Sequence, residues 1–241
     1  MAQKRTLDEF FAIVDHAKRP RKFPLCNVIW RHPTADARLV EFDLRPWAAL
    51  IQRTVDACRP KLVSRPPVVV FGKQCHMQRE VGFFAKETES YGYDFSGQLF
   101  ASREPGEDML ELMGLASEWL TTRFNGCLVN CYLDGRDSIG AHSDSEAGIS
   151  PRGVFAISVG AARRFQLRSK GGKEPVVFET KTKPFHGLLM EGVDFQRVLK
   201  HGIPVEKRVL SERTSLTFRQ HDKAKEDKIY RAIVARNGQI N

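Results

Sequence analysis

Hydrophobic residues along the chain follow two spacings, one typical of helices and the other of strands. Between residues 107 and 123 they recur every three or four positions, which predicts an amphipathic helix. An earlier helix is predicted from Pro46 to about Cys58, because proline is well tolerated in a first helical turn, where its missing N–H costs little. The buried face of the later helix is expected to consist of Met109, Leu112, Met113, Ala116, Trp119 and Leu120.

After Phe124 the pattern changes to short β-prone runs bounded by turn residues. The predicted strands cover residues 127–132, 139–142, 154–159, 164–168, 176–178, 187–190 and 214–218. Gly171-Gly172 is typical of a hairpin turn. Many short strands after two helices indicate an α+β fold, in which a jelly roll (a double-stranded β-helix) is braced by helices. We expect one domain over residues 25–241, preceded by a flexible basic tail over residues 1–24.

Composition narrows the partners and the location. The 241 residues carry a net charge of +9, which favours a polyanionic partner, nucleic acid first; a generic basic protein is the alternative. The five cysteines form no C-x-x-C pair and look like reduced thiols of an intracellular protein. No apolar run approaches the roughly 18 residues that span a bilayer, and the N-terminus lacks the apolar core of a secretory signal, so we expect no membrane association.

The first 24 residues hold two features of their own. The run from Lys18 to Lys22 is basic and contains a proline, which predicts a nuclear import signal or a DNA-contacting arm; a solvated linker is the alternative. Leu7, Phe10 and Phe11 have the spacing of the peptide that docks on the replication sliding clamp, which this segment resembles, although Lys4 replaces its usual glutamine. The alternative is a short amphipathic helix packed on the core of the domain.

His142-Ser143-Asp144 is the strongest candidate for chemistry. Residues two apart in a strand point to the same side, so His142 and Asp144 can both reach one metal ion. Two imidazoles and one carboxylate form the facial triad of non-haem Fe(II) oxygenases. The third ligand is either His201 or His186. Two arginines an even number of positions apart in a later β-prone run share a face and could hold a dicarboxylate, because guanidinium binds carboxylate in a planar fork; they are Arg213 and Arg219.

The order of these motifs resembles the AlkB family of Fe(II)/2-oxoglutarate dioxygenases, which demethylate nucleic acid bases. The resemblance spans roughly residues 68–219 and is carried by Asn130-Cys131-Tyr132, His142-Ser143-Asp144-Ser145-Glu146, Ser158-Val159-Gly160, Arg164-Phe165, His201, Arg213 and Leu216-Thr217-Phe218-Arg219. It implies that Fe(II) is bound by His142, Asp144 and His201. It implies that 2-oxoglutarate, used together with O2, is held by Asn130, Tyr132, Arg213 and Arg219. Ser215 stands where the family often has asparagine, and Gln78 where it often has proline.

A narrower resemblance is to the branch of this family that repairs duplex DNA in eukaryotic nuclei. It is carried by Val70-Phe71-Gly72-Lys73, Arg79 and Tyr93-Asp94-Phe95-Ser96-Gly97. It implies that Phe71 is a finger entering the base stack, and that Tyr93, Phe95 and Ser96 line the pocket of a flipped base with Arg79 and the acidic Glu146. The opposite strand would be gripped by Arg168, Gly172 and Lys173. The alternatives are that Phe71 ends a core strand, that Tyr93 and Phe95 are half-buried strand residues, and that Lys173 is a solvated turn residue.

These resemblances imply oxidative demethylation of N-alkylated bases in DNA, of the 1-methyladenine and 3-methylcytosine type. The DNA is expected to be a duplex with a flipped base, and the protein a nuclear monomer. Residues 25–125 would then hold the nucleotide-recognition region and supporting helices, and residues 126–222 the jelly-roll catalytic core. The alternatives are an RNA demethylase of the same fold and a non-enzymatic damage-binding protein tethered to the clamp.

The finger predicts a substitution effect that differs between substrates. Phe71→Ala removes the ring that fills the space of the flipped base, which costs about 1–3 kcal/mol of stacking. Duplex repair should fall about 5- to 150-fold, whereas repair of a single strand, which has little stack to disrupt, should change far less. The measurement is the ratio of duplex to single-strand activity. An equal loss on both substrates would identify Phe71 as a core residue.

Overall fold

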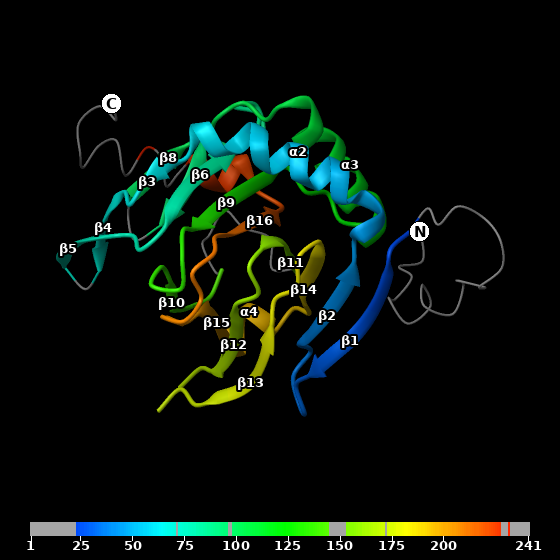
Figure 1. The fold of residues 1–241 in the computed structure, drawn as a ribbon, viewed down its shortest axis with the longest axis vertical. Coiled ribbons are helices and arrows are strands. Elements are labelled where there is room, and N and C mark those ends of the chain that lie inside the picture. The colour runs from blue at the N-terminus through cyan, green and yellow to red at the C-terminus, as the bar shows by residue number, and fades with distance from the viewer. Residues whose placement is uncertain are drawn as a thin grey trace.

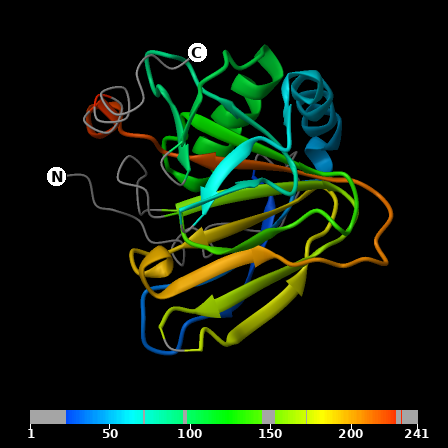
Figure 2. The same ribbon diagram turned by 90° about the vertical axis from the view of Figure 1, so that its left-hand side faces the viewer.

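A computed structural model of the 241-residue chain forms three layers: helices, a large sheet and a small sheet (Figures 1 and 2). The described residues are 23–70, 72–95, 98–144, 153–171, 173–227 and 231. The clamp-like peptide with Leu7, Phe10 and Phe11, and the basic run after it, lie outside them. No helix in the described part of the chain is long and apolar enough to cross a membrane.

The large sheet has eight antiparallel strands in the order β1-β2-β14-β11-β16-β9-β6-β3. Their bounds are β1 Leu25–Arg31, β2 Arg38–Asp43, β3 Val63–Ser64, β6 Glu80–Phe84, β9 Gly126–Tyr132, β11 Gly153–Gly160, β14 His186–Glu191 and β16 Arg213–Arg219. Its central strands are buried on both faces, because helices cover one face and the small sheet covers the other. This sandwich confirms the predicted α+β jelly roll.

The small sheet has four strands in the order β10-β15-β12-β13. Their bounds are β10 Ile139–His142, β12 Arg164–Ser169, β13 Val176–Lys181 and β15 Leu199–Ile203. Gly171, with a φ of +93°, lies in the turn between the paired strands β12 and β13, where the sequence predicts a hairpin. A cluster of buried apolar residues fills the space between the two sheets, including Leu39, Val154, Phe165, Leu167, Leu188, Phe195 and Leu199.

Helices α2 (Ala48–Cys58) and α3 (Glu107–Leu120) pack on the other face of the large sheet (Figure 2). Both predicted helices are present with corrected ends. Pro46 lies in a 3-10 turn, η1 (Arg45–Trp47), that leads into α2. Helix α3 stops three residues early because Thr121 adopts a left-handed conformation with a φ of 48°. The remaining short elements are η2 (Arg59–Lys61), α4 (Phe195–Val198) and the hairpins β4–β5 (Pro67–Val70 and Lys73–His76) and β7–β8 (Gly92–Phe95 and Gln98–Ala101).

Several strands are absent from the sequence-based prediction. The largest omissions are β1 and β2, which form one edge of the large sheet, and β15, which carries His201 in the small sheet. The division of the domain at residue 125 stays a prediction. Strands β1, β2, β3 and β6 all precede that position and join the same large sheet as β9, β11, β14 and β16.

Close packing in the large sheet predicts one intolerant glycine. A Cβ added at Gly187 in β14 would lie 2.4 Å from two ring carbons of Phe155. Gly187→Ala should therefore lower the free energy of unfolding by about 1–3 kcal/mol, the usual cost of overpacking a core. Gly114→Ala is the matched control, because a Cβ there meets open space in the middle of α3. It should raise stability by up to about 1 kcal/mol. Urea titration measures both; equal effects would contradict the packing argument.

Candidate metal centre and anion pocket

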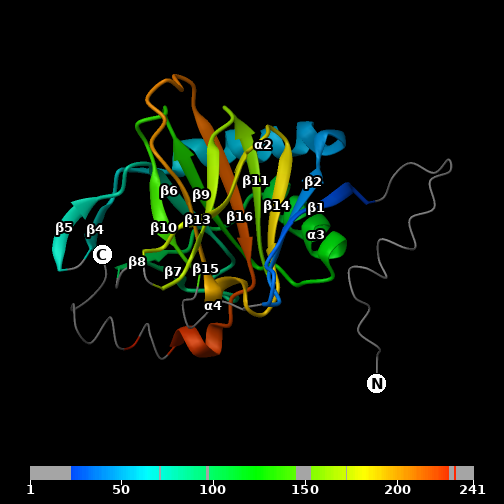
Figure 3. The same cartoon turned by 90° about the horizontal axis from the view of Figure 1, so that it is seen from below.

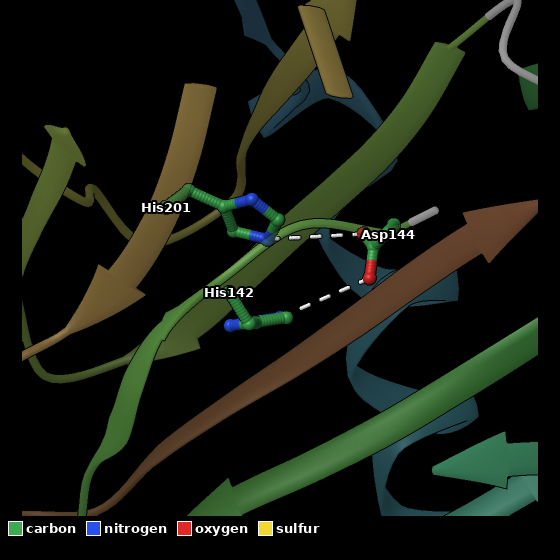
Figure 4. A group of neighbouring side chains, drawn as sticks. All are labelled: His142, Asp144 and His201. Carbon is green, nitrogen blue, oxygen red and sulfur yellow. Dashed lines mark ion pairs between the residues drawn. The ribbon is translucent and has the colours of Figure 1, made fainter. Parts of the chain in front are cut away.

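Three side chains, two from the small sheet and one from the turn after β10, converge on one point (Figure 4). His142 ends β10, Asp144 follows two residues later, and His201 lies opposite His142 across the β10–β15 pair. The distance from Asp144 Oδ1 to His142 Nε2 is 3.8 Å, and that from Oδ2 to His201 Nε2 is 3.7 Å. One ligand atom from each residue lies within 4.8 Å of the others. The arrangement fits a single metal ion with two imidazole ligands and one carboxylate.

Both imidazoles are prepared to act as ligands. Nδ1 of His142 lies 2.9 Å from the Gly140 carbonyl oxygen, which can only accept, so Nδ1 carries the proton and Nε2 keeps its lone pair. Burial lowers the pKa of His201 to about 3, an effect that His142 reinforces. His201 is therefore neutral at pH 7, as metal binding requires.

The Asp144 carboxylate is held by polar partners from other elements. Arg219 Nη2 donates to Asp144 Oδ1 at 2.8 Å, and Tyr93 Oη lies 3.5 Å from the same oxygen. The backbone N–H of Asp144 donates to Gln196 Oε1 at 2.9 Å. Burial favours the neutral acid, but the Arg219 guanidinium and then the two histidines hold the pKa of Asp144 well below its usual range. Its other oxygen, Oδ2, has no hydrogen-bond partner among the described residues and is available to a metal ion.

The alternative third ligand, His186, lies elsewhere. It starts β14 in the large sheet, where it pairs with Ser158 and Asp43. Its Nδ1 is 3.0 Å from the Pro184 carbonyl oxygen, and it is not part of the cluster of ligand atoms. The geometry therefore favours His201 over His186.

The large sheet contributes a second group of polar residues to the same cavity. Strands β9 and β16 pair so that Arg213 lies opposite Tyr132 and Ser215 opposite Asn130. The alternation of side chains turns these residues and Arg219 toward the small sheet. The cavity lies between the sheets and is lined by Arg79, Tyr93, Asn130, Tyr132, His142, His201, Arg213 and Arg219, among others.

Arg213 is buried with unsatisfied donors. Its Nη2 donates to Ser158 Oγ at 2.8 Å, and its guanidinium carbon lies 5.3 Å from the centre of the Tyr132 ring. Nε and Nη1 have no hydrogen-bond partner within the described residues. Arg213 is only 3% exposed, and this burial lowers its pKa. A buried guanidinium with unpaired N–H groups fits an anionic ligand, since each unsatisfied donor is costly.

The donor set thus fits the iron and dicarboxylate that the sequence predicts. The ligand cluster formed by His142, Asp144 and His201 offers imidazole nitrogen and carboxylate oxygen, both ligands of Fe(II). The cavity also buries the guanidiniums of Arg79, Arg213 and Arg219, of which Arg219 pairs with the carboxylate of Asp144. This excess of positive charge favours a ligand with two negative charges.

The residues predicted to contact substrate fall into three groups: those that line the cavity, those that lie away from it, and those that the structure does not describe. Tyr93 and Arg79 line the cavity; Tyr93 stacks on Phe83 with ring centroids 6.0 Å apart, and Arg79 Nε donates to Asn130 Oδ1 at 2.7 Å. Arg168 and Lys173 lie away from the cavity, where Arg168 donates to the Glu174 carbonyl and Lys173 is exposed. Phe95 belongs to β7, but its side chain is not described. Phe71, Ser96, Glu146 and Gly172 lie outside the described residues.

The two departures from the family pattern have local explanations. Ser215 faces the cavity, and its Oγ lies 3.2 Å from Thr217 Oγ1. Gln78 accepts from the backbone N–H of Ser138 through its carbonyl oxygen. This bond ties the start of β6 to the segment before β10, so the chain path into Arg79 is fixed without a proline.

Three residues have supporting roles that the sequence does not predict, although one of them, Ser158, belongs to a motif of the family resemblance. Gln196 anchors the backbone of Asp144, and Ser158 holds Arg213. Arg163 is fully buried and donates to Glu206 and to the carbonyls of Asp134, Asp137 and Pro204, which binds two loops beside Tyr132. Each lies far in sequence from the groups it supports.

Comparisons with known proteins agree with this geometry. The 2OG-Fe(II) oxygenase superfamily matches residues 46–219. The DNA oxidative demethylase ALKBH2 of Mus musculus is 36% identical over 160 residues, which cover 64% of this chain and 66% of that protein. For ALKBH2 of Homo sapiens the identity is also 36%, covering 64% of this chain and 60% of that protein. The chain thus spans about 60–66% of the length of these relatives. The AlkB resemblance is confirmed.

Two further relatives broaden the comparison. The alpha-ketoglutarate-dependent dioxygenase alkB homolog 3 of Rattus norvegicus is 38% identical over 104 residues, covering 40% of this chain and 35% of that protein. The solved structure of OsALKBH1 superposes with a TM-score of 0.51 at 16% identity, covering 81% of this chain and 100% of that one. The second likeness concerns the fold alone.

The geometry predicts which histidine binds metal. His201→Ala should weaken Fe(II) binding at least about 100-fold, because loss of a ligand should cost no less than the 10–100-fold typical of losing a supporting residue. His186→Ala is the matched control and should bind Fe(II) within about twofold of the unsubstituted protein. Anaerobic calorimetry with Fe(II) measures both affinities. Weak binding by the His186 variant and normal binding by the His201 variant would move the ligand to β14.

Proposed function

The chain belongs to the 2OG-Fe(II) oxygenase superfamily, and from this membership we propose that it oxidatively removes methyl groups from N-alkylated bases of DNA. The superfamily uses Fe(II), 2-oxoglutarate and O2, so the chain is a dioxygenase that depends on these three. The single observation that carries the proposal is that one cavity between the sheets brings together the ligand cluster, the buried arginines and the ring of Tyr93.

We assign the ligand cluster as the binding site of Fe(II). His142, Asp144 and His201 would be its ligands and leave one side of the ion open. Arg219 keeps Asp144 ionised and fixed in orientation, through the bond from its Nη2 to Asp144 Oδ1. Gln196 fixes the backbone of the same residue. These supports restrict the carboxylate, which would otherwise rotate away from the ion.

We assign the arginine side of the cavity to 2-oxoglutarate. Arg213 has two donors, Nε and Nη1, that no described residue satisfies, and a carboxylate would take both in a fork. Tyr132 and Asn130 lie on the neighbouring strand, and Arg79 fixes the Asn130 amide by donating to its oxygen. The amide then presents its N–H groups to the cavity. The chain thereby excludes water and supplies positive charge before the co-substrate arrives.

When bound, iron, 2-oxoglutarate and O2 supply the oxidation of an N-methyl carbon to N–CH2OH, with release of succinate and CO2. The hydroxymethyl group then leaves as formaldehyde: its hydroxyl proton goes to water, and the electron pair of the broken C–N bond stays on the ring nitrogen, which restores the neutral base. The residues of the chain control access to this chemistry. Tyr93, whose hydroxyl lies next to Asp144, lines the same cavity and would be the aromatic neighbour of a base that enters it.

The methylated bases that we propose as substrates combine a positive charge with a flat ring. N1-methyladenine and N3-methylcytosine are cationic, and an electron-rich ring such as that of Tyr93 attracts a cation. By the family resemblance Glu146 would add a carboxylate and Phe71 would fill the space of a base flipped from a duplex. Extrusion of a base costs a few kcal/mol, which stacking on aromatic side chains offsets. The net charge of +9 favours the DNA backbone.

The remaining parts of the proposal concern location and partners. A basic run at Lys18–Lys22 supports nuclear import, and the spacing of Leu7, Phe10 and Phe11 supports docking on the replication sliding clamp. Both would bring the enzyme to duplex DNA. Together with a monomeric state, they complete the function expected from the sequence.

One assay tests the proposal against its rivals. The protein with Fe(II), 2-oxoglutarate and O2 is offered a single 1-methyladenine in duplex DNA, in single-stranded DNA and in single-stranded RNA, and formaldehyde and the demethylated strand are quantified. We expect turnover on DNA, with duplex preferred. Asp144→Ala should lower it at least about 100-fold, while His186→Ala is the active control. Turnover on RNA alone would identify an RNA demethylase. Tight binding of the methylated strand without release of formaldehyde would identify a damage-binding protein.

A further inference from the structure

A buried carboxylate outside the metal site joins two distant parts of the chain. Glu226 lies in a short helical segment, residues 223–227 (orange-red in Figure 3), beyond the superfamily match that ends at residue 219. Its oxygens accept from Ser90 Oγ at 2.9 and 3.1 Å and from the backbone N–H of Tyr91 at 3.0 Å. His221 Nδ1 lies 2.8 Å from Glu226 Oε1. We call Ser90, His221 and Glu226 the C-terminal clasp.

The clasp is a built arrangement and not a surface contact. Ser90 is fully buried, and His221 and Glu226 are 6% and 9% exposed. Burial of a carboxylate is costly unless donors satisfy it, and here three donors do so. Two more bonds secure the same segment: the backbone N–H of His221 donates to Asn125 Oδ1, and Asn125 Nδ2 donates to the His221 carbonyl.

The clasp holds the strand that walls the substrate side of the cavity. Ser90 and Tyr91 lead directly into β7, whose second residue is Tyr93. The Tyr93 hydroxyl lies 3.5 Å from Asp144 Oδ1, and its ring lies 5.0 Å from the Arg219 guanidinium carbon. A second path runs through rings: His221 packs on Phe83 with centroids 5.0 Å apart, and Phe83 stacks on Tyr93. The C-terminal segment thus reaches Tyr93 from its backbone and from its ring.

We propose that Glu226 is a positioning residue for the substrate. By holding the start of β7, Glu226 fixes Tyr93 beside the ligand cluster. The proposal rests on the proposed function, since the substrate is the methylated base. It assigns to residues 221–226 a part in base recognition that is separate from binding of iron and 2-oxoglutarate, because none of the clasp residues lines the cavity between the sheets.

Substitutions in the clasp should affect substrate recognition alone. Glu226→Ala removes the Glu226 oxygens that accept from Ser90 Oγ and from the Tyr91 N–H, and leaves Ser90 Oγ its longer bond to the Gly92 carbonyl oxygen at 3.2 Å, so β7 should shift. The KM for the methylated oligonucleotide should rise about 10- to 100-fold, because stacking of the base on Tyr93 is weakened, while kcat and the affinity for 2-oxoglutarate stay within about twofold. Glu226→Gln should restore most of the loss, because its amide oxygen can still accept from Ser90 and from the Tyr91 N–H, and its NH2 can donate to Nδ1 of the other His221 tautomer. Lys225→Ala, an exposed change in the same segment, is the matched control.

Hydrogen exchange separates this proposal from the proposed function. In Glu226→Ala, the amides of residues 90–95 should exchange about tenfold faster or more, the factor expected from losing one hydrogen bond to a charged group. Those of residues 199–203, near the ligand cluster, should not change. Faster exchange with no demethylation by the unsubstituted protein would retain the clasp and reject the function. Unchanged exchange at residues 90–95, or an equal loss of oligonucleotide and 2-oxoglutarate affinity, would overturn the clasp.

Discussion

The negative charge of Asp144, buried between two sheets, is the constraint on which the site depends. A carboxylate cannot stay ionised in such a place without partners. Arg219 from β16 supplies a direct charge-assisted hydrogen bond, and His142 and His201 lie on either side. Because Arg79 and Arg213 are buried in the same cavity, positive groups outnumber negative ones there. The electrostatics of the cavity therefore favour binding of an anion, and a bound metal ion would strengthen this preference.

The sandwich meets this constraint through alternation. Strand β16 has seven buried residues, and its cavity-facing half consists of Arg213, Ser215, Thr217 and Arg219, while Leu216 and Phe218 join the core under the helices. One strand thus carries both the chemistry and the packing that holds it in place. Such an arrangement is rigid, because moving either arginine would require moving apolar side chains packed on the opposite face.

Local spacing determined how much the sequence could reveal. His142 and Asp144 are two residues apart, and Arg213 and Arg219 six, so each pair can be placed on one face without knowledge of the fold. The β-runs and both helices follow from periodicity in the same way. His201 could not be separated from His186, because the choice depends on the register of β10 with β15. Edge strand β1 mixes exposed and half-buried residues and gives no clear pattern. Ser158, Gln196 and the clasp depend on contacts between distant segments, and the roles of the site residues stay predictions.

The two proposed ligand sets lie on different sheets, and this has a consequence for how the site is assembled. The proposed iron ligands belong to the small sheet and the turn after β10, whereas the arginines proposed to hold 2-oxoglutarate belong to the large one. A newly made or damaged chain in which the sheets have not docked would lack a complete reaction centre. Completion of the site therefore requires docking of the two sheets, so the site depends on the tertiary structure and not on either sheet alone.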